Sequence, residues 1–142
     1  MKQIQFHFET PFPGFKNRTE LKLFISKLCK REKRIAGKID FVFCSDDYLL
    51  NINQNFLQHD TFTDIISFDY TDHNAPLTGE IYISVDRVKE NAINLGVSSS
   101  LELHRVIFHG VLHLCGYKDK LKADKTLMRA KEDFYLREYF GH

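Results

Sequence analysis

Apolar residues recur at two different spacings along the chain, and each spacing predicts a different kind of element. Residues 3–8 alternate between polar and apolar side chains, which is typical of a strand with one buried face. Residues 39–44, 63–70 and 80–85 are three further short runs rich in β-branched and aromatic residues. The chain is therefore expected to form four strands.

Five other segments carry apolar residues at helical spacing or begin with a good capping sequence. Ser45 and Asp86 are the expected N-caps of the second and third helices, because their side-chain oxygens can accept from free backbone N–H groups. Gly96 and Gly116 are expected to end the third and fourth helices in the left-handed conformation. The helices are predicted at residues 19–34, 45–56, 86–95, 98–115 and 124–139.

The order of these elements mixes strands and helices, and it predicts an α+β fold over residues 1–142 as a single domain. We expect a small mixed four-stranded sheet with helices packed against it and a metal site on a central helix, as in a zincin-like metallohydrolase. The length of 142 residues suits one domain with a substantial core.

Composition says more about the cellular compartment of the chain than about its function. The formal net charge of +1 predicts no partner, so a nucleic-acid surface would have to come from local clustering. Three widely spaced cysteines, Cys29, Cys44 and Cys115, indicate buried thiols of a reducing compartment rather than a disulfide framework. The sequence has no signal-peptide pattern and no apolar run near the ~18 residues of a membrane span, so we expect a cytoplasmic protein without a membrane partner.

The strongest chemical signal is a pair of histidines inside the apolar run of the fourth helix. His109 and His113 are four residues apart, so they project from nearly the same helix face and can bind one metal ion. Gly116 would end the helix and reverse the chain, which could return Asp119 as a third ligand. The alternative is a pair of surface or hydrogen-bonded core histidines, but uncompensated burial of two imidazoles would be costly.

Two histidines and one carboxylate leave coordination positions open, which is typical of a catalytic zinc site. Such an ion would lower the pKa of a bound water and supply hydroxide near neutral pH. Zn²⁺ is the expected cofactor, and another divalent transition metal is the alternative. Gly110 occupies the position of the general-base glutamate in the zincin motif His-Glu-x-x-His, which disfavours a peptidase. Gly110 would either leave room beside the metal or allow close approach of a strand.

Three motifs in order resemble those of the YbeY family of bacterial endoribonucleases. The segment 109–117, His-Gly-Val-Leu-His-Leu-Cys-Gly-Tyr, is similar to the family's His-Gly-x-Leu-His-Leu-x-Gly-Tyr. Upstream, residues 63–68 resemble the family's Thr-Asp-Val-Leu-Ser-Phe strand, and residues 79–84 its Gly-Asp-Ile-x-Ile-Ser segment. Asn51 fits the family's Leu-Asn element. The resemblance covers roughly residues 46–132.

The chain departs from the family pattern at three places. Asp119 stands where the family has its third histidine ligand, so the implied metal ligands are His109, His113 and Asp119, with Asp124 as an alternative and helix capping as a non-ligand role for Asp119. Leu57 replaces an arginine implied to contact RNA phosphate, a role that His59 or Lys118 could take. Glu80 replaces an aspartate and could orient a ligand histidine or accept a proton, unless it is a strand-end surface charge.

The resemblance implies a metal-dependent endoribonuclease that cleaves single-stranded RNA, with His109 and Glu80 as catalytic residues. It also implies maturation of the 3′ end of small-subunit (16S) ribosomal RNA, ribosome quality control, and a ribosome or small-subunit partner. One alternative is a ribosome-associated binding module with a structural metal, and another is a non-haem iron oxygenase. A rim of basic residues could follow the phosphates of the strand: Lys118, Lys120, Lys122, Lys125 and Arg129.

Overall fold

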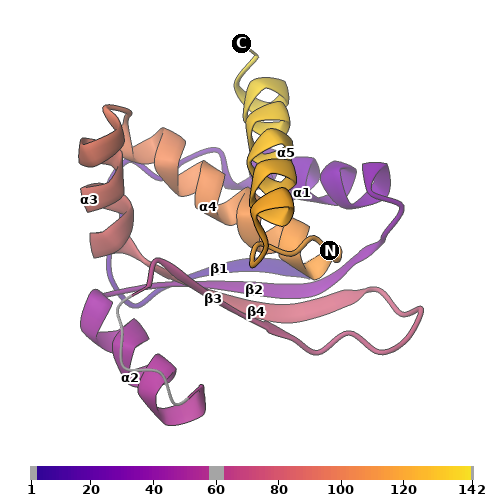
Figure 1. Ribbon diagram of the computed structural model, residues 1–142, viewed down its shortest axis with the longest axis horizontal. Coiled ribbons are helices and arrows are strands. Elements are labelled where there is room, and N and C mark those ends of the chain that lie inside the picture. Colours follow the sequence, from indigo (N-terminus) through magenta and orange to yellow (C-terminus); the bar gives the residue numbers. More distant parts are fainter. Residues whose placement is uncertain (1–2, 58–62, 142) are drawn as a thin grey trace.

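A four-stranded sheet forms the centre of the computed structural model, which describes residues 3–57 and 63–141 (Figure 1). The strands are β1 (Ile4–Phe8), β2 (Ala36–Cys44), β3 (Ile65–Asp69) and β4 (Leu77–Ser84). They lie in the order β1-β2-β4-β3. The first two pairings are parallel, whereas β3 runs antiparallel to β4. The expected mixed four-stranded sheet is confirmed.

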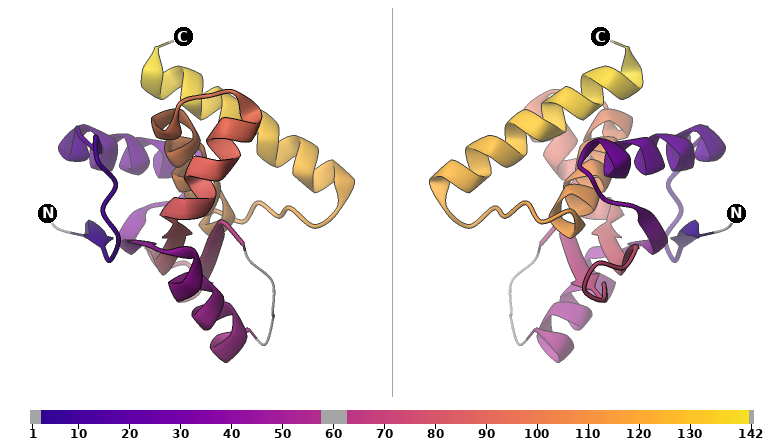
Figure 2. Two further views of the ribbon diagram at one scale, coloured as in Figure 1. Left: turned by 90° about the vertical axis from the view of Figure 1, so that its left-hand side faces the viewer. Right: turned by 90° about the vertical axis from the view of Figure 1, so that its right-hand side faces the viewer.

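Helices cover the two faces of this sheet unequally. Helix α4 lies across one face and is flanked there by α1 and α5, while α2 lies on the opposite face (Figures 1 and 2). Helix α3 packs against α4 at one end of the sheet. The helices are α1 (Arg18–Arg31), α2 (Asp46–Phe56), α3 (Val85–Leu95), α4 (Ser99–Leu114) and α5 (Lys122–Phe140). The α+β class is therefore confirmed.

The core lies between the sheet and α4. Phe41 and Ile81 of the sheet and Phe108 and Val111 of α4 are fully buried. Gly110 lets helix and sheet approach closely, because a Cβ atom there would lie 2.9 Å from Ile81 Cγ2. Most residues of α4 are buried, which makes it the central helix of the fold, as the sequence predicts.

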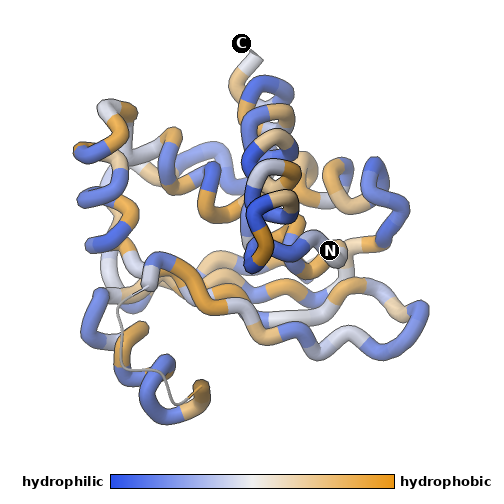
Figure 3. Tube along the Cα trace, viewed as in Figure 1, coloured by the Kyte–Doolittle hydropathy of each residue, from blue (hydrophilic) through white to orange (hydrophobic). Residues whose placement is uncertain are grey.

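Hydrophilic residues occupy most of the outer surface of α5 and the loop between β3 and β4, while hydrophobic positions recur along the strands (Figure 3). No helix in the described part of the chain combines the length and hydrophobicity that a membrane span requires.

Several element boundaries differ from those expected. Ser84, rather than Asp86, is the N-cap of α3, and its hydroxyl accepts from the Arg87 N–H at 3.1 Å. Asp86 instead accepts from the backbone N–H of Asp46, so it helps to satisfy the first turn of α2. Asp86 has a side chain suited to capping α3, but its carboxylate binds the start of α2 instead. Strands β2 and β4 also begin three residues earlier than predicted, because pairing extends beyond their apolar runs.

Candidate metal and active site

The C-terminal half of α4 and the turn after it bring a histidine and a carboxylate together. Gly116 has a φ of 112°, and its N–H donates to the carbonyl of His113. This positive φ ends the helix and reverses the chain. The returning segment places Asp119 Oδ2 3.2 Å from His109 Nε2. The structure therefore places Asp119 beside His109.

Both ring nitrogens of His109 face carboxylates. Its Nδ1–H donates to Glu132 Oε2 at 2.7 Å, and Glu132 comes from the middle of α5. Burial by itself lowers the pKa of His109, but Glu132, Asp119 and Asp64 together raise it above its usual range. The Nδ1 contact fixes the ring and leaves Nε2 directed at Asp119, which is the arrangement typical of a metal-binding histidine.

His113 lies one turn along α4 and is exposed. Within residues 3–57 and 63–141, no set of three or more His, Cys, Asp or Glu side chains is arranged to hold a metal ion. The structure therefore brings together two of the three predicted ligands, His109 and Asp119, and leaves His113 outside the pair. Imidazole and carboxylate are donors that zinc accepts, so the pair fits such an ion in its chemistry.

His109 and Asp119 line a pocket of about 340 Å³ between α4, α5 and the start of β3. Asp64 lies on its wall, where burial raises the pKa of the carboxyl. Glu102 is 4% exposed, and burial raises its pKa as well. The remaining residues that line the pocket are Thr63, Ile65, Arg105, Val106 and Arg129.

Arg105 balances part of this negative charge. Its guanidinium donates to Asp133 at 2.8 Å and to Glu132 at 3.2 Å, and it lies 3.6 Å from Glu102. Because Glu132 also accepts from His109, the arginine and the histidine share one carboxylate. This chain of contacts connects α4 to α5 beside the pocket.

The structure does not bring Glu80 to this pocket. Gly79 and Ile81 face α4, since a Cβ on Gly79 would contact Leu114 and Ile81 contacts Gly110. Side chains alternate along a strand, so Glu80 points to the opposite face. There it accepts hydrogen bonds from the hydroxyls of Tyr70 at 3.1 Å and Tyr82 at 3.3 Å. Glu80 is therefore not placed to orient His109 or to accept a proton beside it.

The other residues that the sequence singled out lie around the pocket or away from it. Asp124 is in the first turn of α5 and does not line the pocket. Leu57 ends α2 on the other side of the sheet and is 41% exposed. Lys118 is exposed and outside the pocket lining, whereas His59 falls outside the described residues. Cys115 contacts Cys29 rather than His109.

Sequence reasoning missed Glu132 and Asp64. Glu132 is 5% exposed within a helix otherwise rich in exposed charges. Glu132 lies directly before Asp133 in a charged run, so the sequence gives no sign that its side chain is buried while its neighbours are solvated. Asp64 belongs to the segment 63–68 that resembles a family motif, and a carboxylate next to a buried strand was the signal that could have identified it.

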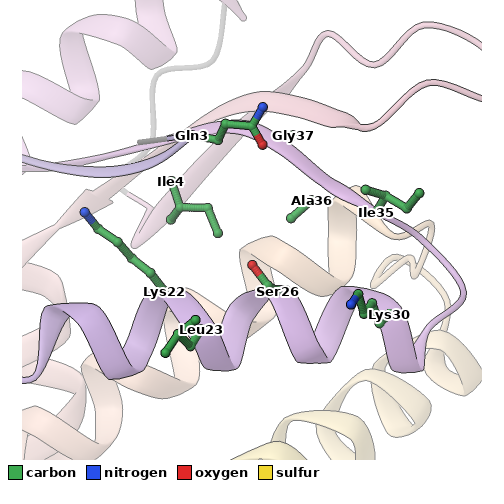
Figure 4. Close-up of a pocket in the computed structure, with 9 residues that line it drawn as sticks. All are labelled: Gln3, Ile4, Lys22, Leu23, Ser26, Lys30, Ile35, Ala36 and Gly37. Atoms are coloured by element: carbon green, nitrogen blue, oxygen red, sulfur yellow. The ribbon is translucent and has the colours of Figure 1, made fainter. Parts of the chain in front are cut away.

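A separate pocket of about 360 Å³ lies between α1 and the starts of β1 and β2 (Figure 4). Lys22 and Lys30 are its charged residues, and its lining includes Ser26 and Gln3. It contains no histidine or carboxylate among its lining residues, so it offers neither metal ligands nor acid–base groups. The pocket at His109 is the better candidate for the active site.

Comparisons with known proteins agree with the motifs. A family model described as Endoribonuclease YbeY matches residues 8–140. An Endoribonuclease YbeY of Flavobacterium psychrophilum is 48% identical over 134 residues, which are 94% of this chain and 94% of that protein. An Endoribonuclease YbeY of Porphyromonas gingivalis is 43% identical over 145 residues, covering 99% of this chain and 95% of that protein.

The fold also has a counterpart among solved structures. The solution structure of TM1509 from Thermotoga maritima matches with a TM-score of 0.68 and 28% identity, over 96% of this chain and 89% of that chain. The likeness thus extends over the sheet, the histidine helix and the helix that carries Glu132. With a match of this extent, the chain belongs to the Endoribonuclease YbeY family.

Proposed function

We propose that this protein is a metal-dependent endoribonuclease that hydrolyses phosphodiester bonds of single-stranded RNA. The proposal is carried by one observation, the pocket in which His109 Nδ1 is bound to Glu132 while Nε2 faces Asp119 at 3.2 Å. Membership of a family whose members are named endoribonucleases supplies the substrate class. The names of the relatives support the endoribonuclease activity, and the pocket at His109 is the proposed location of the active site.

His109 and Asp119 would hold the ion. His113 lies one turn along the same helix and outside this pair, and we propose it as the third donor on its helical spacing from His109. Zinc is the expected ion because it accepts imidazole and carboxylate ligands. When bound, such an ion supplies Lewis acidity, which activates water and stabilises negative charge on phosphate oxygens. Glu132 keeps the His109 ring in one orientation and one tautomer, since it holds the Nδ1 proton.

Asp64 is the side chain best placed to exchange a proton beside the ion. It lines the same pocket as His109, and burial raises the pKa of its carboxyl, which makes the carboxylate a stronger base. A carboxylate there would accept the proton of the attacking water. The departing nucleotide oxygen would take a proton in turn, so that hydrolysis leaves one phosphate end and one hydroxyl end.

The resemblance to this family also motivates a proposal for the natural RNA substrate, the partner and the cellular location. We propose that the substrate is the 3′ region of small-subunit (16S) ribosomal RNA, that the protein acts with the ribosome or small subunit in rRNA maturation and quality control, and that it works in the cytoplasm.

A cleavage assay with matched variants tests the proposal. Purified wild-type protein, His113→Ala and Asp119→Ala are incubated with single-stranded and duplex oligoribonucleotides, and the metal content of each protein is measured. We expect about one equivalent of metal and cleavage of the single strand for the wild type, with both reduced in the variants. Equal cleavage by wild type and Asp119→Ala would reject the site, and equal cleavage by wild type and His113→Ala would remove His113 from the ligand set. Equal inactivity with retained ribosome binding would favour a binding module with a structural metal.

A further inference from the structure

The pocket that holds His109 and Asp119 is lined by carboxylates, and a polyanionic RNA strand needs a cation there. The five basic residues of the predicted rim follow the histidine helix in the sequence. All five belong to the described part of the chain, and of these Arg129 is the one that lines the pocket. The four lysines lie on the α4–α5 loop or the first turn of α5, and all four are exposed: Lys118, Lys120, Lys122 and Lys125.

The two arginines that line the pocket are engaged to very different degrees. The side chain of Arg105 is 18% exposed and lies within 3.6 Å of three carboxylates. The side chain of Arg129 is 56% exposed, and its ion pair with Glu132 is 3.9 Å long. Arg105 thus holds α4 and α5 together, whereas the side chain of Arg129 lines the same pocket and is largely open to solvent.

We propose that Arg129 is the residue of this pocket that contacts a phosphate of the bound RNA strand. The planar guanidinium can donate two parallel hydrogen bonds to phosphate oxygens, which a lysine cannot reproduce. Its position on α5, one turn before Asp133 and three residues before Glu132, keeps it beside His109. The proposal rests on the endoribonuclease function proposed above.

Binding measurements test this role separately from cleavage. The probe is a single-stranded phosphorothioate oligoribonucleotide that resists hydrolysis, titrated into the metal-containing protein at several salt concentrations. Arg129→Gln should weaken binding about tenfold at low salt and reduce the salt dependence by about one phosphate contact. Arg129→Lys keeps the charge but not the planar group and should fall between wild type and Arg129→Gln.

The matched control is Arg137→Gln, which removes the same charge from an exposed arginine two turns later on the same helix. Arg137 lies outside the pocket lining and outside the basic rim, so this variant should change binding less than about twofold. Metal content and thermal unfolding of each variant establish that site and fold are intact. If Arg129→Gln is poorly folded, Arg129→Lys and Arg129→Ala provide the comparison.

The outcomes separate the two proposals. Equal binding by wild type, Arg129→Gln and Arg137→Gln, with cleavage by the wild type intact, overturns the role of Arg129 alone. Equal losses in Arg129→Gln and Arg137→Gln also overturn it, since general charge would then explain the effect. A wild-type protein that binds the strand through Arg129 but never cleaves RNA overturns the proposed function and leaves Arg129 as a binding residue.

Discussion

Glu132 is the buried carboxylate on which the site geometry depends at the scale of single residues. It accepts from His109 Nδ1 at 2.7 Å and from Arg105 at 3.2 Å, although it is only 5% exposed. Outer partners of this kind fix the orientation of a metal ligand and raise its affinity for the ion. The consequence is measurable in metal affinity without any RNA.

Glu132→Gln should therefore lower zinc affinity by about ten- to a hundredfold. The amide keeps the shape of the side chain but removes the charge that holds the Nδ1 proton of His109. Competition with a chromogenic chelator measures the affinity. The control is Glu138→Gln, which removes a half-exposed carboxylate from α5, the helix that also carries Glu132. Glu138 pairs with Arg31 of α1, and the zinc affinity of this variant should match that of the wild type. Identical affinities in both variants would contradict the role of Glu132.

His104 carries a different residue-scale prediction, since it is a histidine outside the site. Its ring lies among aromatic rings, with centroids 5.2 Å from Tyr139 and 5.0 Å from Phe140. Burial lowers the pKa of His104 below its usual value, although its hydrogen bond to the Ser100 carbonyl opposes the shift. Below about pH 6.5 the unfolded chain binds a proton at this residue more readily than the folded chain, so stability falls as pH falls.

Replacing His104 by phenylalanine should make the free energy of unfolding less dependent on pH between 7 and 5. Urea denaturation of wild type and His104→Phe at several pH values measures the difference. Parallel pH profiles for the two proteins would show that His104 does not cause the acid sensitivity.

Sequence patterns predicted the pairing of His109 with Asp119 because the information is local. Helical spacing, a glycine stop and a separation of nine intervening residues fix where Asp119 returns. Glu132 and Asp64 come from other elements, and only tertiary packing brings them to the same pocket. The prediction that Glu80 lies beside the histidines was wrong although local information was sufficient to place it. Ile81 and Ile83 are buried, and because side chains alternate along a strand, Glu80 lies on the face away from the core.

At the scale of elements, the α4–α5 loop that carries Asp119 is fixed to α1 by one carboxylate. Glu32, just after α1, accepts from the Tyr117 hydroxyl at 2.6 Å, from Lys131 at 3.3 Å and from the Tyr135 hydroxyl. Burial alone would raise the pKa of Glu32, but these three donors lower it. Arg34 adds a bond to the Cys115 carbonyl at 3.3 Å. The loop is therefore held at two points close to Asp119.

Tyr117→Phe should loosen this loop and lower zinc affinity several-fold, with a loss of about 1–2 kcal/mol in stability from the missing bond to a charged acceptor. Tyr70→Phe is the matched control, because it removes a hydroxyl bound to Glu80 on the opposite sheet face. Chelator competition and urea denaturation give the two readouts. A Tyr117→Phe protein with unchanged zinc affinity would show that the loop holds Asp119 without this anchor.

The contact of α4 with the sheet is a second element-scale feature, and it explains Gly110. An added Cβ would meet Ile81 Cγ2 at 2.9 Å and Ile65 Cδ1 at 3.1 Å, so close approach of the strands is the supported explanation for this glycine. Alanine gains about 1 kcal/mol in helix propensity, but overpacking a tight core costs about 1–3 kcal/mol. Gly110→Ala should be net destabilising by about 1 kcal/mol in urea denaturation. A stabilised variant would mean that the two isoleucines move aside easily.

At the scale of the whole molecule, most of the core lies away from the site. Phe41, Ile81 and Val111 belong to the core under α4 and do not line the pocket of His109 and Asp119. Val106 and Ile65 are the residues shared between the core cluster and the pocket lining. The sequence predicted the number and kind of elements because each has its own periodicity. It could not predict the order β1-β2-β4-β3, since pairing partners are chosen by tertiary contacts rather than by local pattern.

This separation predicts that metal removal leaves the fold intact. Treatment with a strong chelator should preserve the far-UV circular dichroism spectrum and a cooperative unfolding transition, and should lower Tm by a few degrees through loss of ligand binding. Small zinc domains that lack a core unfold completely under the same treatment. Loss of helical signal after chelation would show that the ion holds the fold together.

The double role of α4 has a consequence for genetic work on this protein. The same helix supplies the centre of the core through Phe108, Val111 and Leu112 and the reactive face through His109. A screen for inactive variants will therefore return neighbouring positions for two unrelated reasons, poor accumulation in the cell and failed chemistry. Measuring how much soluble protein each clone yields, alongside its activity, is what will tell these two groups of alleles apart.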